Sequence, residues 1–407
     1  MDLAATEALI SWVTEAGLEG KAEADLLQGF CERANAAGLP LARALVLVDT
    51  LHPVYEGRVF RWQRDAGEFS RQTEYERAQD PEDPLAVKWR QSPFYRLAQT
   101  GHTSLRRCLA RGDPADFATV AELAEQGHTD YLALAHRFSG AGAIGEMDAI
   151  YSSWTTDAPD GFGDPDLAFL QRAAASLALA VKSASLARIA GTLVETYLGR
   201  DAGRRVLAGR IVRGVADRAT KVLWYSDLRG YTRITDTAVP EQIIPLLNDY
   251  AEATIGAIHD AGGDVLKLIG DGTLAVFRGS DPGIGCRDAL KAARLLAKRI
   301  AAVNRRRTAA GQPWTQAYLA LHVGEVLYGN IGSPDRLDFT VVGPAVNEVA
   351  RIAAMCRSVE REVLLSQAFA AAALPEDRAG LVSVGRYALR GVGQPQELFT
   401  LAPEAAA

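Results

Sequence analysis

The chain has 407 residues, of which 44 are basic and 50 are acidic, so its formal net charge is −6. This length favours two domains, and the shares of hydrophobic and charged residues, 48% and 23%, are those of a globular protein. The mild acidity argues against a dedicated nucleic-acid-binding protein, which usually carries a basic stripe. It leaves room for an anionic nucleotide, because local fields outweigh net charge.

The four cysteines are scattered along the chain and form no CxxC pair, which argues against a disulfide framework or a zinc site. The first 20 residues contain acids and no basic region, so they do not resemble a signal peptide. We also find no uninterrupted apolar run of the roughly 18 to 20 residues that a membrane span needs. The sequence therefore predicts a cytoplasmic protein, in a reduced compartment, without a transmembrane segment.

The first half of the chain mixes helical and strand periodicity. The predicted elements are helices at 2–17 and 21–37, strands at 41–49 and 57–63, a surface loop over 65–90, short elements at 92–98 and 104–111, a helix at 117–127, strands at 131–138 and 148–155, and a long helix at 164–190. This order, with an aromatic, a polar turn and an acid in residues 160–167 before the last helix, resembles a GAF sensor domain. The resemblance implies an α/β sensor domain at 1–185 that takes a small-molecule ligand. Its aromatic residues either line such a pocket or belong to the core.

Residues 186–215 are the predicted helical linker between the halves. Leu186, Ile189, Leu193 and Leu198 recur at roughly helical spacing and form an apolar stripe. Such a stripe can pair with a second copy of the chain. The alternative is a linker helix that packs on its own domain.

The second half again alternates strands and helices. We predict a strand at 222–226, a helix at 240–261, a hairpin of strands 264–269 and 273–278, a helix at 283–307, strands at 316–323 and 325–332, and a helix at 345–357.

Two acids in this half have special settings. Asp227 ends the apolar run 222–226, and Asp271 lies in a Gly-Asp-Gly turn between two apolar runs. Acids at a strand end and at a tight turn can converge on one divalent cation, because magnesium prefers carboxylate oxygens and substrate phosphates. Taken singly, Asp227 also fits a helix N-cap and Asp271 an ordinary turn residue.

At these acids the chain resembles the class III nucleotide cyclases, over residues 213–401. Further motifs recur in the family's order, namely the run 267–273 around Asp271, the run DFTVVG at 338–343, and PAVNEVAR at 344–351. The resemblance implies an α+β catalytic domain at 216–407 with a ferredoxin-like βαβ core and an antiparallel sheet. It also implies that Asp227, Asp271 and the backbone carbonyl of Leu228 hold two Mg²⁺ or Mn²⁺ ions in each active site.

The same resemblance assigns residues to the triphosphate. The turn Arg229, Gly230, Tyr231 and Thr232 follows the first acid and can aim backbone N–H groups at phosphates. Arg390, in the run LRGVG at 389–393, takes the place of a family lysine that touches the triphosphate. The alternative for Arg390 is a solvated turn residue.

Lys267 and Thr340 occupy the positions at which adenylate cyclases read the adenine ring, so the resemblance favours ATP over GTP. Without the resemblance, Lys267 would be a solvated strand-edge lysine and Thr340 an ordinary strand residue.

Asn347 and Arg351 lie four residues apart and therefore share one helix face. An amide that orients the ribose and a guanidinium that meets the pentavalent phosphate make chemical sense together, and the resemblance makes both catalytic. Both are also common on exposed helix faces. Pro344 departs from the family's usual Asp or Asn, although proline suits a helix start.

In the family, the metal acids come from one protomer and the residues matching Lys267, Thr340, Asn347 and Arg351 come from the other. Because this chain has both sets, the resemblance implies a homodimer with two equivalent sites. The leading hypothesis is an adenylate cyclase that converts ATP to 3′,5′-cyclic AMP and pyrophosphate under the control of the N-terminal domain. The alternatives are a cyclase for GTP or a pyrimidine nucleotide, and a non-catalytic nucleotide-binding signalling module.

Overall fold

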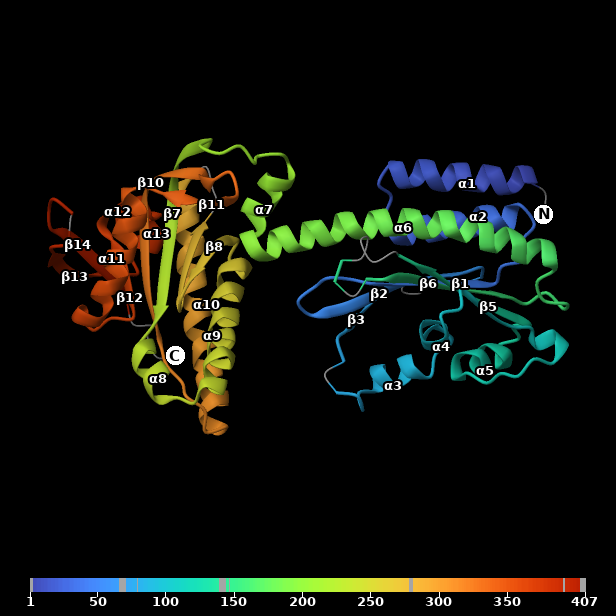
Figure 1. Cartoon of the computed structure of the whole chain (residues 1–407). Coiled ribbons are helices and arrows are strands. Elements are labelled where there is room, and N and C mark those ends of the chain that lie inside the picture. Colours follow the sequence, from blue (N-terminus) through green and yellow to red (C-terminus); the bar gives the residue numbers. More distant parts are fainter. Residues whose placement is uncertain are drawn as a thin grey trace. The chain divides into compact units, whose positions relative to one another are not determined.

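The computed structural model describes residues 3–65, 71–78, 80–138, 144–145, 147–277, 281–390 and 392–402. It divides into two compact units, one up to Leu193 and one from Val194 onward, each built of helices around a sheet (Figure 1). The predicted α+β class is confirmed. The boundary between the units lies inside the predicted linker, 186–215.

The first unit contains a six-stranded antiparallel sheet in the order β3-β2-β1-β6-β5-β4. Its strands are β1 (Arg43–Asp49), β2 (Tyr55–Gln63), β3 (Gln72–Glu76), β4 (Ser104–Arg107), β5 (Asp130–Arg137) and β6 (Ala149–Thr156).

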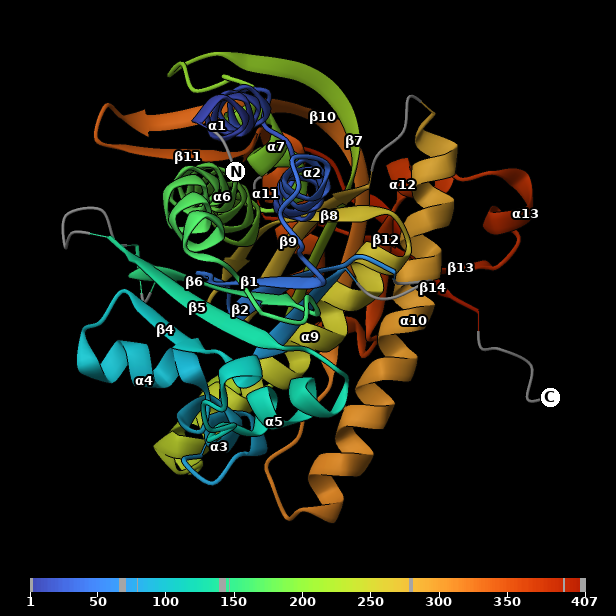
Figure 2. The same cartoon turned by 90° about the vertical axis from the view of Figure 1, so that its right-hand side faces the viewer.

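Helices cover both faces of this sheet. One face carries α1 (Leu3–Leu18), α2 (Glu23–Ala36) and α6 (Asp164–Leu198), and the other carries α3 (Pro84–Arg90), α4 (Pro93–Thr100) and α5 (Ala118–Glu125), with the short 3₁₀ helix η1 (Leu109–Arg111) nearby in the chain (Figures 1 and 2). Successive side chains of β6 point to opposite faces of the sheet, so this strand contributes to the hydrophobic core on each face. Trp154 packs with Phe30 on the first face, and Tyr151 packs with Phe94 on the second.

The predicted surface loop at 65–90 is wrong for part of its length, because it contains β3 and α3. The strand β3 is a polar edge strand (QTEYE) with no apolar alternation to reveal it. The start of α3 has local signals, since Pro84 is its first residue and the side chain of Asp83 accepts a hydrogen bond from the backbone N of Leu85 at 2.8 Å. Residues 66–70 and 79 of this prediction lie outside the described residues.

The helix α6 runs eight residues beyond the predicted end at 190. By length and composition it is apolar enough to cross a membrane, which the sequence analysis did not anticipate, and it is the one helix of the described residues that passes this test. Its side chains from Phe169 to Ile189 contribute to the core of the first unit. Of its most apolar 18-residue window, 33% is buried inside the structure.

The second unit is built on an eight-stranded sheet, with the path β13-β14-β12-β10-β7-β9-β8 and β11 paired to β10. Its strands are β7 (Ala216–Leu228), β8 (Gly263–Ile269), β9 (Gly272–Phe277), β10 (Ala317–Ser333), β11 (Arg336–Val342), β12 (Val363–Ser366), β13 (Leu381–Tyr387) and β14 (Gln396–Leu401). The strand β7 lies between β10 and β9 and pairs antiparallel with both.

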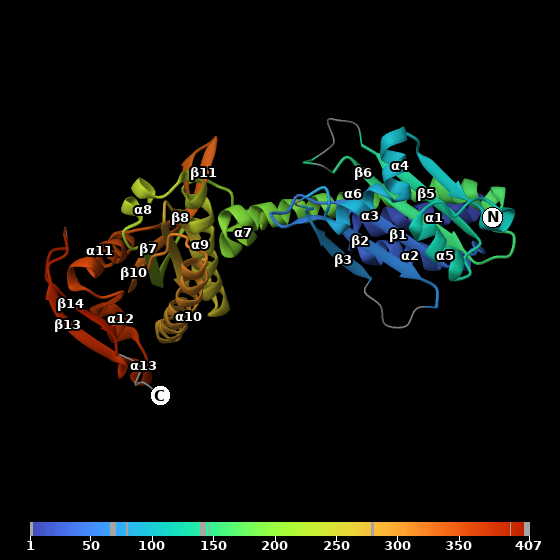
Figure 3. The same ribbon diagram turned by 90° about the horizontal axis from the view of Figure 1, so that it is seen from below.

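The helices of this unit lie on both faces of the sheet, with α9 and α10 on one and α11 on the other (Figures 1 and 3). The helical elements are α7 (Arg200–Leu207), α8 (Tyr231–Thr237), η3 (Pro240–Gln242), α9 (Ile243–Asp260), α10 (Pro282–Ala309), α11 (Pro344–Val359), α12 (Gln367–Ala372) and α13 (Pro375–Arg378). Side chains along β7 also point alternately to the two faces of the sheet and contribute to the core on each. Trp224 packs with the α9 and α10 side chains, and Leu223 packs with those of α11.

Three strand predictions in this unit need correction. The strands predicted at 316–323 and 325–332 are one continuous strand, β10. The strand predicted at 222–226 is the end of the longer β7, whose first half is polar. The strand β11 and the elements after α11 were not predicted as such. Arg278, the last residue of a predicted strand, lies outside the described residues.

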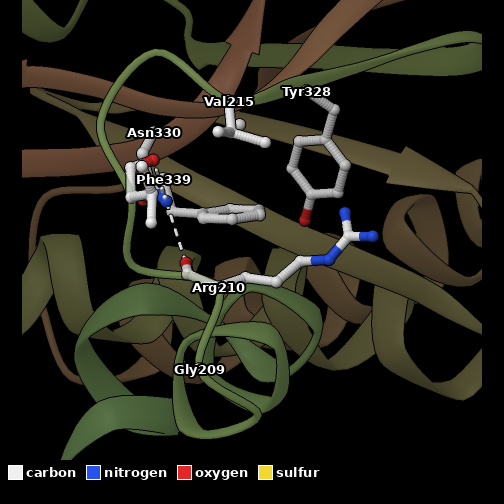
Figure 4. Close-up of a pocket in the computed structure, with 8 residues that line it drawn as sticks. Gly209, Arg210, Val215, Tyr328, Asn330 and Phe339 are labelled. Atoms are coloured by element: carbon white, nitrogen blue, oxygen red, sulfur yellow. Dashed lines mark hydrogen bonds between the residues drawn. The ribbon is translucent and has the colours of Figure 1, made fainter.

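The segment after α7 packs on the hairpin of β10 and β11. The side-chain N of Asn330 donates hydrogen bonds to the backbone carbonyls of Arg210, at 2.8 Å, and Val212, at 3.3 Å (Figure 4). A cavity of about 160 Å³ lies between this segment and the hairpin, lined by Gly209, Arg210, Val212, Val215, Tyr328, Gly329, Asn330 and Phe339. None of the predicted site residues lines it.

Candidate active site

Asp227 is the penultimate residue of the central strand β7 and lies opposite Tyr318 of β10. Its carboxyl group is half-buried, and one oxygen, Oδ1, is fully buried without a hydrogen-bond partner among the described residues. Buried polar atoms are nearly always paired, so an unpaired buried carboxylate oxygen calls for an explanation. A bound cation is one.

Asp271 lies in the tight turn between β8 and β9, next to the end of β7. Its Oδ2 accepts a hydrogen bond from the backbone N of Leu228 at 3.1 Å. Glycines make the turn possible, since Gly270 has a φ of +62°. A Cβ on Gly272 would lie 3.2 Å from the carbonyl oxygen of Ser226. The two predicted acids, from separate segments, therefore meet at one end of the strand.

The backbone around Leu228 points its polar groups toward Asp271. The backbone N of Arg229 donates to the carbonyl of Gln316 at 2.8 Å, on the β10 side of β7. In a trans peptide the preceding carbonyl points the opposite way, and the described residues contain no cis peptide bond. The Leu228 carbonyl thus points toward β9. The N–H of Leu228 points the same way and donates to Asp271. A carbonyl that coordinates the same ion as the two acids has to point in this direction.

Burial and a neighbouring carboxylate make Asp227 harder to ionise. Burial first, and the Asp271 carboxylate second, raise the pKa of Asp227 from 3.8 to about 6. The Tyr225 phenol lies within reach of both acids, and its pKa is raised by burial and then by Asp227 and Asp271. A pair of carboxylates with this environment is a candidate functional site.

The acid pair, Asp227 and Asp271, suits a divalent ion of the magnesium type. Such an ion takes one or two carboxylates and fills its remaining positions with water and substrate phosphate oxygens. The described residues contain no cluster of three His, Cys, Asp or Glu side chains that could hold a metal, so an all-protein cage of the zinc type does not arise there. Within this pair, the Oδ1 atom of Asp227 is the buried oxygen without a hydrogen-bond partner among the described residues.

The predicted phosphate-contacting turn follows directly. Arg229 and Gly230 are exposed, and Gly230 has a left-handed φ of +67° and precedes the seven-residue helix α8, which contains Tyr231 and Thr232. The Arg229 guanidinium lies 6.0 Å from the centre of the Tyr318 ring. All four residues therefore follow Asp227 closely in the chain. The N–H and the carbonyl of Arg229 are hydrogen-bonded to Gln316 and Thr315, and Gly230 is exposed.

The predicted base-reading residues lie on β8 and β11, two strands that are not paired with each other in the sheet. Lys267 of β8 forms an ion pair with Asp338 of β11, and Thr340 lies two residues further along β11, half-buried. Because strand side chains alternate, Asp338 and Thr340 share one face of β11. Asp338 was not among the predicted site residues. Its spacing of two residues from Thr340 was the signal that could have placed both on one face of the strand.

Asn347 and Arg351 lie one turn apart on α11, Asn347 exposed and Arg351 half-buried. Arg390 is exposed near the C-terminal strands. Within the part of the chain that the structure describes, no hydrogen bond or ion pair joins Asn347, Arg351 or Arg390 to the acid pair.

Comparison with solved structures matches about half of the chain to nucleotide cyclases. A bacterial light-regulated adenylyl cyclase aligns with 51% of this chain and 59% of its own, at 21% identity and a TM-score of 0.44. The adenylyl cyclase of P. aeruginosa aligns with 47% of this chain and 97% of its own, at 20% identity and a TM-score of 0.42. A guanylyl cyclase aligns with 46% of this chain and 95% of its own, at 26% identity and a TM-score of 0.41.

Among curated sequences, an uncharacterized protein of Mycobacterium tuberculosis is 33% identical over 212 residues, which are 50% of this chain and 37% of that protein. The adenylate cyclase of Anabaena cylindrica is 32% identical over 158 residues, or 38% of this chain and 31% of the cyclase. The chain thus spans about a third of the length of these relatives. No protein-family model matches the chain.

Proposed function

We propose that this chain is a nucleotide cyclase that closes a nucleoside triphosphate into a 3′,5′-cyclic monophosphate and releases pyrophosphate. The observation that carries the proposal is the acid pair, with a buried Asp227 oxygen that lacks a partner among the described residues and a second carboxylate beside it. The likeness to the Anabaena cylindrica adenylate cyclase supports the same reading.

Asp227, Asp271 and the Leu228 carbonyl would hold two Mg²⁺ or Mn²⁺ ions. When bound, such ions polarise phosphate oxygens and favour the ionised form of an attacking hydroxyl. In the reaction, the ribose 3′ oxygen bonds to the α-phosphorus while the bond to the β-phosphate bridging oxygen breaks. The backbone N–H groups of residues 230–232 are suited to the triphosphate.

The remaining residues complete the chemistry. Asn347 orients the ribose, and Arg351 stabilises the charge on the pentavalent phosphorus. Arg390 is proposed as a further triphosphate contact, because arginine binds phosphate oxygens in pairs.

Adenine is the proposed base. Lys267 is an exposed cation held beside Asp338, and Thr340 adds a hydroxyl on the same face as Asp338. A cationic donor, a carboxylate acceptor and a hydroxyl can match the ring nitrogen and the exocyclic amine of adenine. This arrangement favours ATP as substrate.

The proposed active form is a homodimer regulated by the first unit. Within the described residues of one chain no hydrogen bond or ion pair joins the α11 residues to the acid pair, so in this proposal a second copy of the chain supplies them. The first unit is proposed as a GAF-like sensor whose ligand changes how the catalytic units meet. Deleting residues 1–185 should then change activity or abolish its response to ligand, and unchanged behaviour would defeat the regulatory part.

The direct test is a product assay. The purified chain is incubated with ATP, GTP, CTP or UTP and either Mg²⁺ or Mn²⁺, beside the Asp271→Ala variant. We expect cyclic AMP from ATP with the wild type and none with the variant. If GTP is turned over in preference to ATP, the proposed base is guanine and not adenine. If the chain binds nucleotide but forms no cyclic product, it is a nucleotide-binding module and not an enzyme.

A further inference from the structure

A buried polar cluster lies beneath the segment that leads into β10. The backbone N of Thr315 donates to the Tyr250 hydroxyl at 2.7 Å, and that hydroxyl donates to the side-chain oxygen of Asn304 at 2.5 Å. The side-chain N of Asn304 closes the ring by donating to the Thr315 carbonyl at 2.8 Å. All three residues are buried, with exposures of 1% for Tyr250, 9% for Asn304 and 6% for Thr315.

The same segment is anchored a second time. Arg307 of α10 is 1% exposed, and its Nε donates to the carbonyl of Pro313 at 2.6 Å. Its guanidinium also forms an ion pair with Asp249 of α9 at 2.5 Å. Buried polar groups that are fully paired hold one geometry, because any shift leaves a group unsatisfied. Helices α9 and α10 therefore fix residues 313–315 in place.

From this fixed segment, two hydrogen bonds reach the turn at residues 228–230. The Thr315 hydroxyl donates to the Arg229 carbonyl at 2.5 Å, and the Arg229 N–H donates to the Gln316 carbonyl at 2.8 Å. They restrain two successive peptide planes. The first plane contains the Leu228 carbonyl, and the second leads into Gly230, which has a left-handed backbone.

We propose that Thr315 is a positioning residue for the metal-binding turn. Its hydroxyl orients the peptides that follow Asp227, so that the Leu228 carbonyl and the backbone of residues 229–230 are preorganised for the cations and the triphosphate. This inference depends on the proposed function, since it concerns the same acid pair. Partners outside the ligand shell commonly change metal affinity by about ten- to a hundredfold when they are removed.

A purely structural role is the alternative. In that case the hydroxyl only satisfies a carbonyl in the interior, and its loss should lower thermal stability without changing metal affinity. The two roles separate if metal binding and stability are measured on the same variants.

The experiment compares Thr315→Val, which keeps the branched shape and loses the hydroxyl, with Thr315→Ser, which keeps the hydroxyl. The matched control is Thr400→Val, because the Thr400 hydroxyl donates to the Val363 carbonyl at 2.7 Å in another part of the same unit. Tyr250→Phe is the second variant, in case Thr315→Val does not fold. Each full-length protein is titrated with Mn²⁺ at saturating 3′-deoxy-ATP, which lacks the attacking hydroxyl. Free Mn²⁺ is followed by electron paramagnetic resonance, and the melting temperature is recorded without ligand.

We expect Thr315→Val to bind Mn²⁺ about tenfold more weakly than the wild type, Tyr250→Phe to weaken binding in the same direction, and Thr315→Ser and Thr400→Val to bind as the wild type does. Wild-type affinity in a folded Thr315→Val or Tyr250→Phe protein would overturn the positioning role and leave the proposed function intact. Failure of the wild type itself to bind Mn²⁺ with the nucleotide would overturn both.

Discussion

Asp130 in the first unit is buried and Asp227 in the second has one buried carboxylate oxygen, but the two acids differ in what surrounds them. The Asp130 side chain is fully buried and accepts hydrogen bonds from the Arg106 guanidinium at 2.6 and 3.1 Å and from the backbone N of Phe162 at 3.0 Å. Asp227 has a buried oxygen without a partner among the described residues, and its charged neighbour is another acid, Asp271.

The contrast separates two uses of a buried charge. A structural acid receives its counter-charge from its own chain, because an uncompensated buried charge destabilises the fold. An acid that binds a cation receives no counter-charge from its own chain. It is repelled by a neighbouring carboxylate until the cation binds. The predictions below test this difference, from the largest expected effect to the smallest.

Replacing Asp271 should remove the activity and spare the fold. We expect Asp271→Asn to lower kcat by about a thousandfold, as losses of charge stabilisation at a reaction centre do. The free energy of unfolding without metal should stay the same or rise, since a like charge beside Asp227 is gone. Product formation and urea unfolding measure the two quantities. A large loss of stability would mean that Asp271 is structural.

Replacing Asp130 should do the reverse. Asp130→Asn leaves Arg106 without its counter-charge, and we expect the first unit to lose about 3 kcal/mol of stability. The matched control is Asp116→Asn, because Asp116 pairs with Arg107 at 2.7 Å at a more exposed position and should cost less than about 1 kcal/mol. Equal effects of the two variants in thermal or urea unfolding would remove the distinction between them.

Lys267 tests whether an ion pair within the second unit serves stability or substrate. Both partners are partly exposed, at 46% for Lys267 and 38% for Asp338, so Lys267→Ala should change the free energy of unfolding by less than about 1 kcal/mol. We expect the KM for ATP to rise about tenfold, because hydrogen bonds from charged groups are worth that much. An unchanged KM for ATP, and unchanged preference for ATP over GTP, would remove Lys267 from the base site.

Buried histidines should change stability with pH in the same direction in both units. Burial lowers the pKa of His136 in the first unit from its ordinary 6.5, and burial does the same for His322 in the second, opposed by Glu348. The unfolded chain then binds protons that the folded chain does not, so stability should fall as pH drops below about 6.5. Melting temperatures between pH 7 and pH 5 test this, and His136→Gln should reduce the acid sensitivity of the first unit. Acid stabilisation of the first unit would contradict the sign. In the second unit the raised pKa of Asp227 acts in the opposite direction, because the folded chain binds that proton before the unfolded chain does as the pH falls.

The sequence predicted the meeting of Asp227 and Asp271, because a strand end and a glycine turn are both local signals. It could not give the length of β7, whose polar first half is a strand through its pairing with β10. The predicted strands 316–323 and 325–332 left a break at Gly324. In the fold, a Cβ there would lie 2.5 Å from the Ala345 Cβ, so the glycine allows α11 to approach an unbroken strand.

The residues missed by sequence reasoning share one cause. Asp338 meets Lys267 because β8 and β11 come close only in the folded unit. Thr315 lies in a polar segment that reads as a plain loop, and its role follows from contacts with α9 and with the turn after Asp227. Such partnerships depend on tertiary packing, which periodicity and spacing do not record.

The most direct test is a crystal grown with Mn²⁺ and 3′-deoxy-ATP and measured at a wavelength where manganese scatters anomalously. We predict a manganese peak bonded to carboxylate oxygens of both Asp227 and Asp271, with the Leu228 carbonyl in the same coordination shell. Manganese bound to the nucleotide but to neither carboxylate, or carboxylates turned away from the triphosphate, would contradict the account.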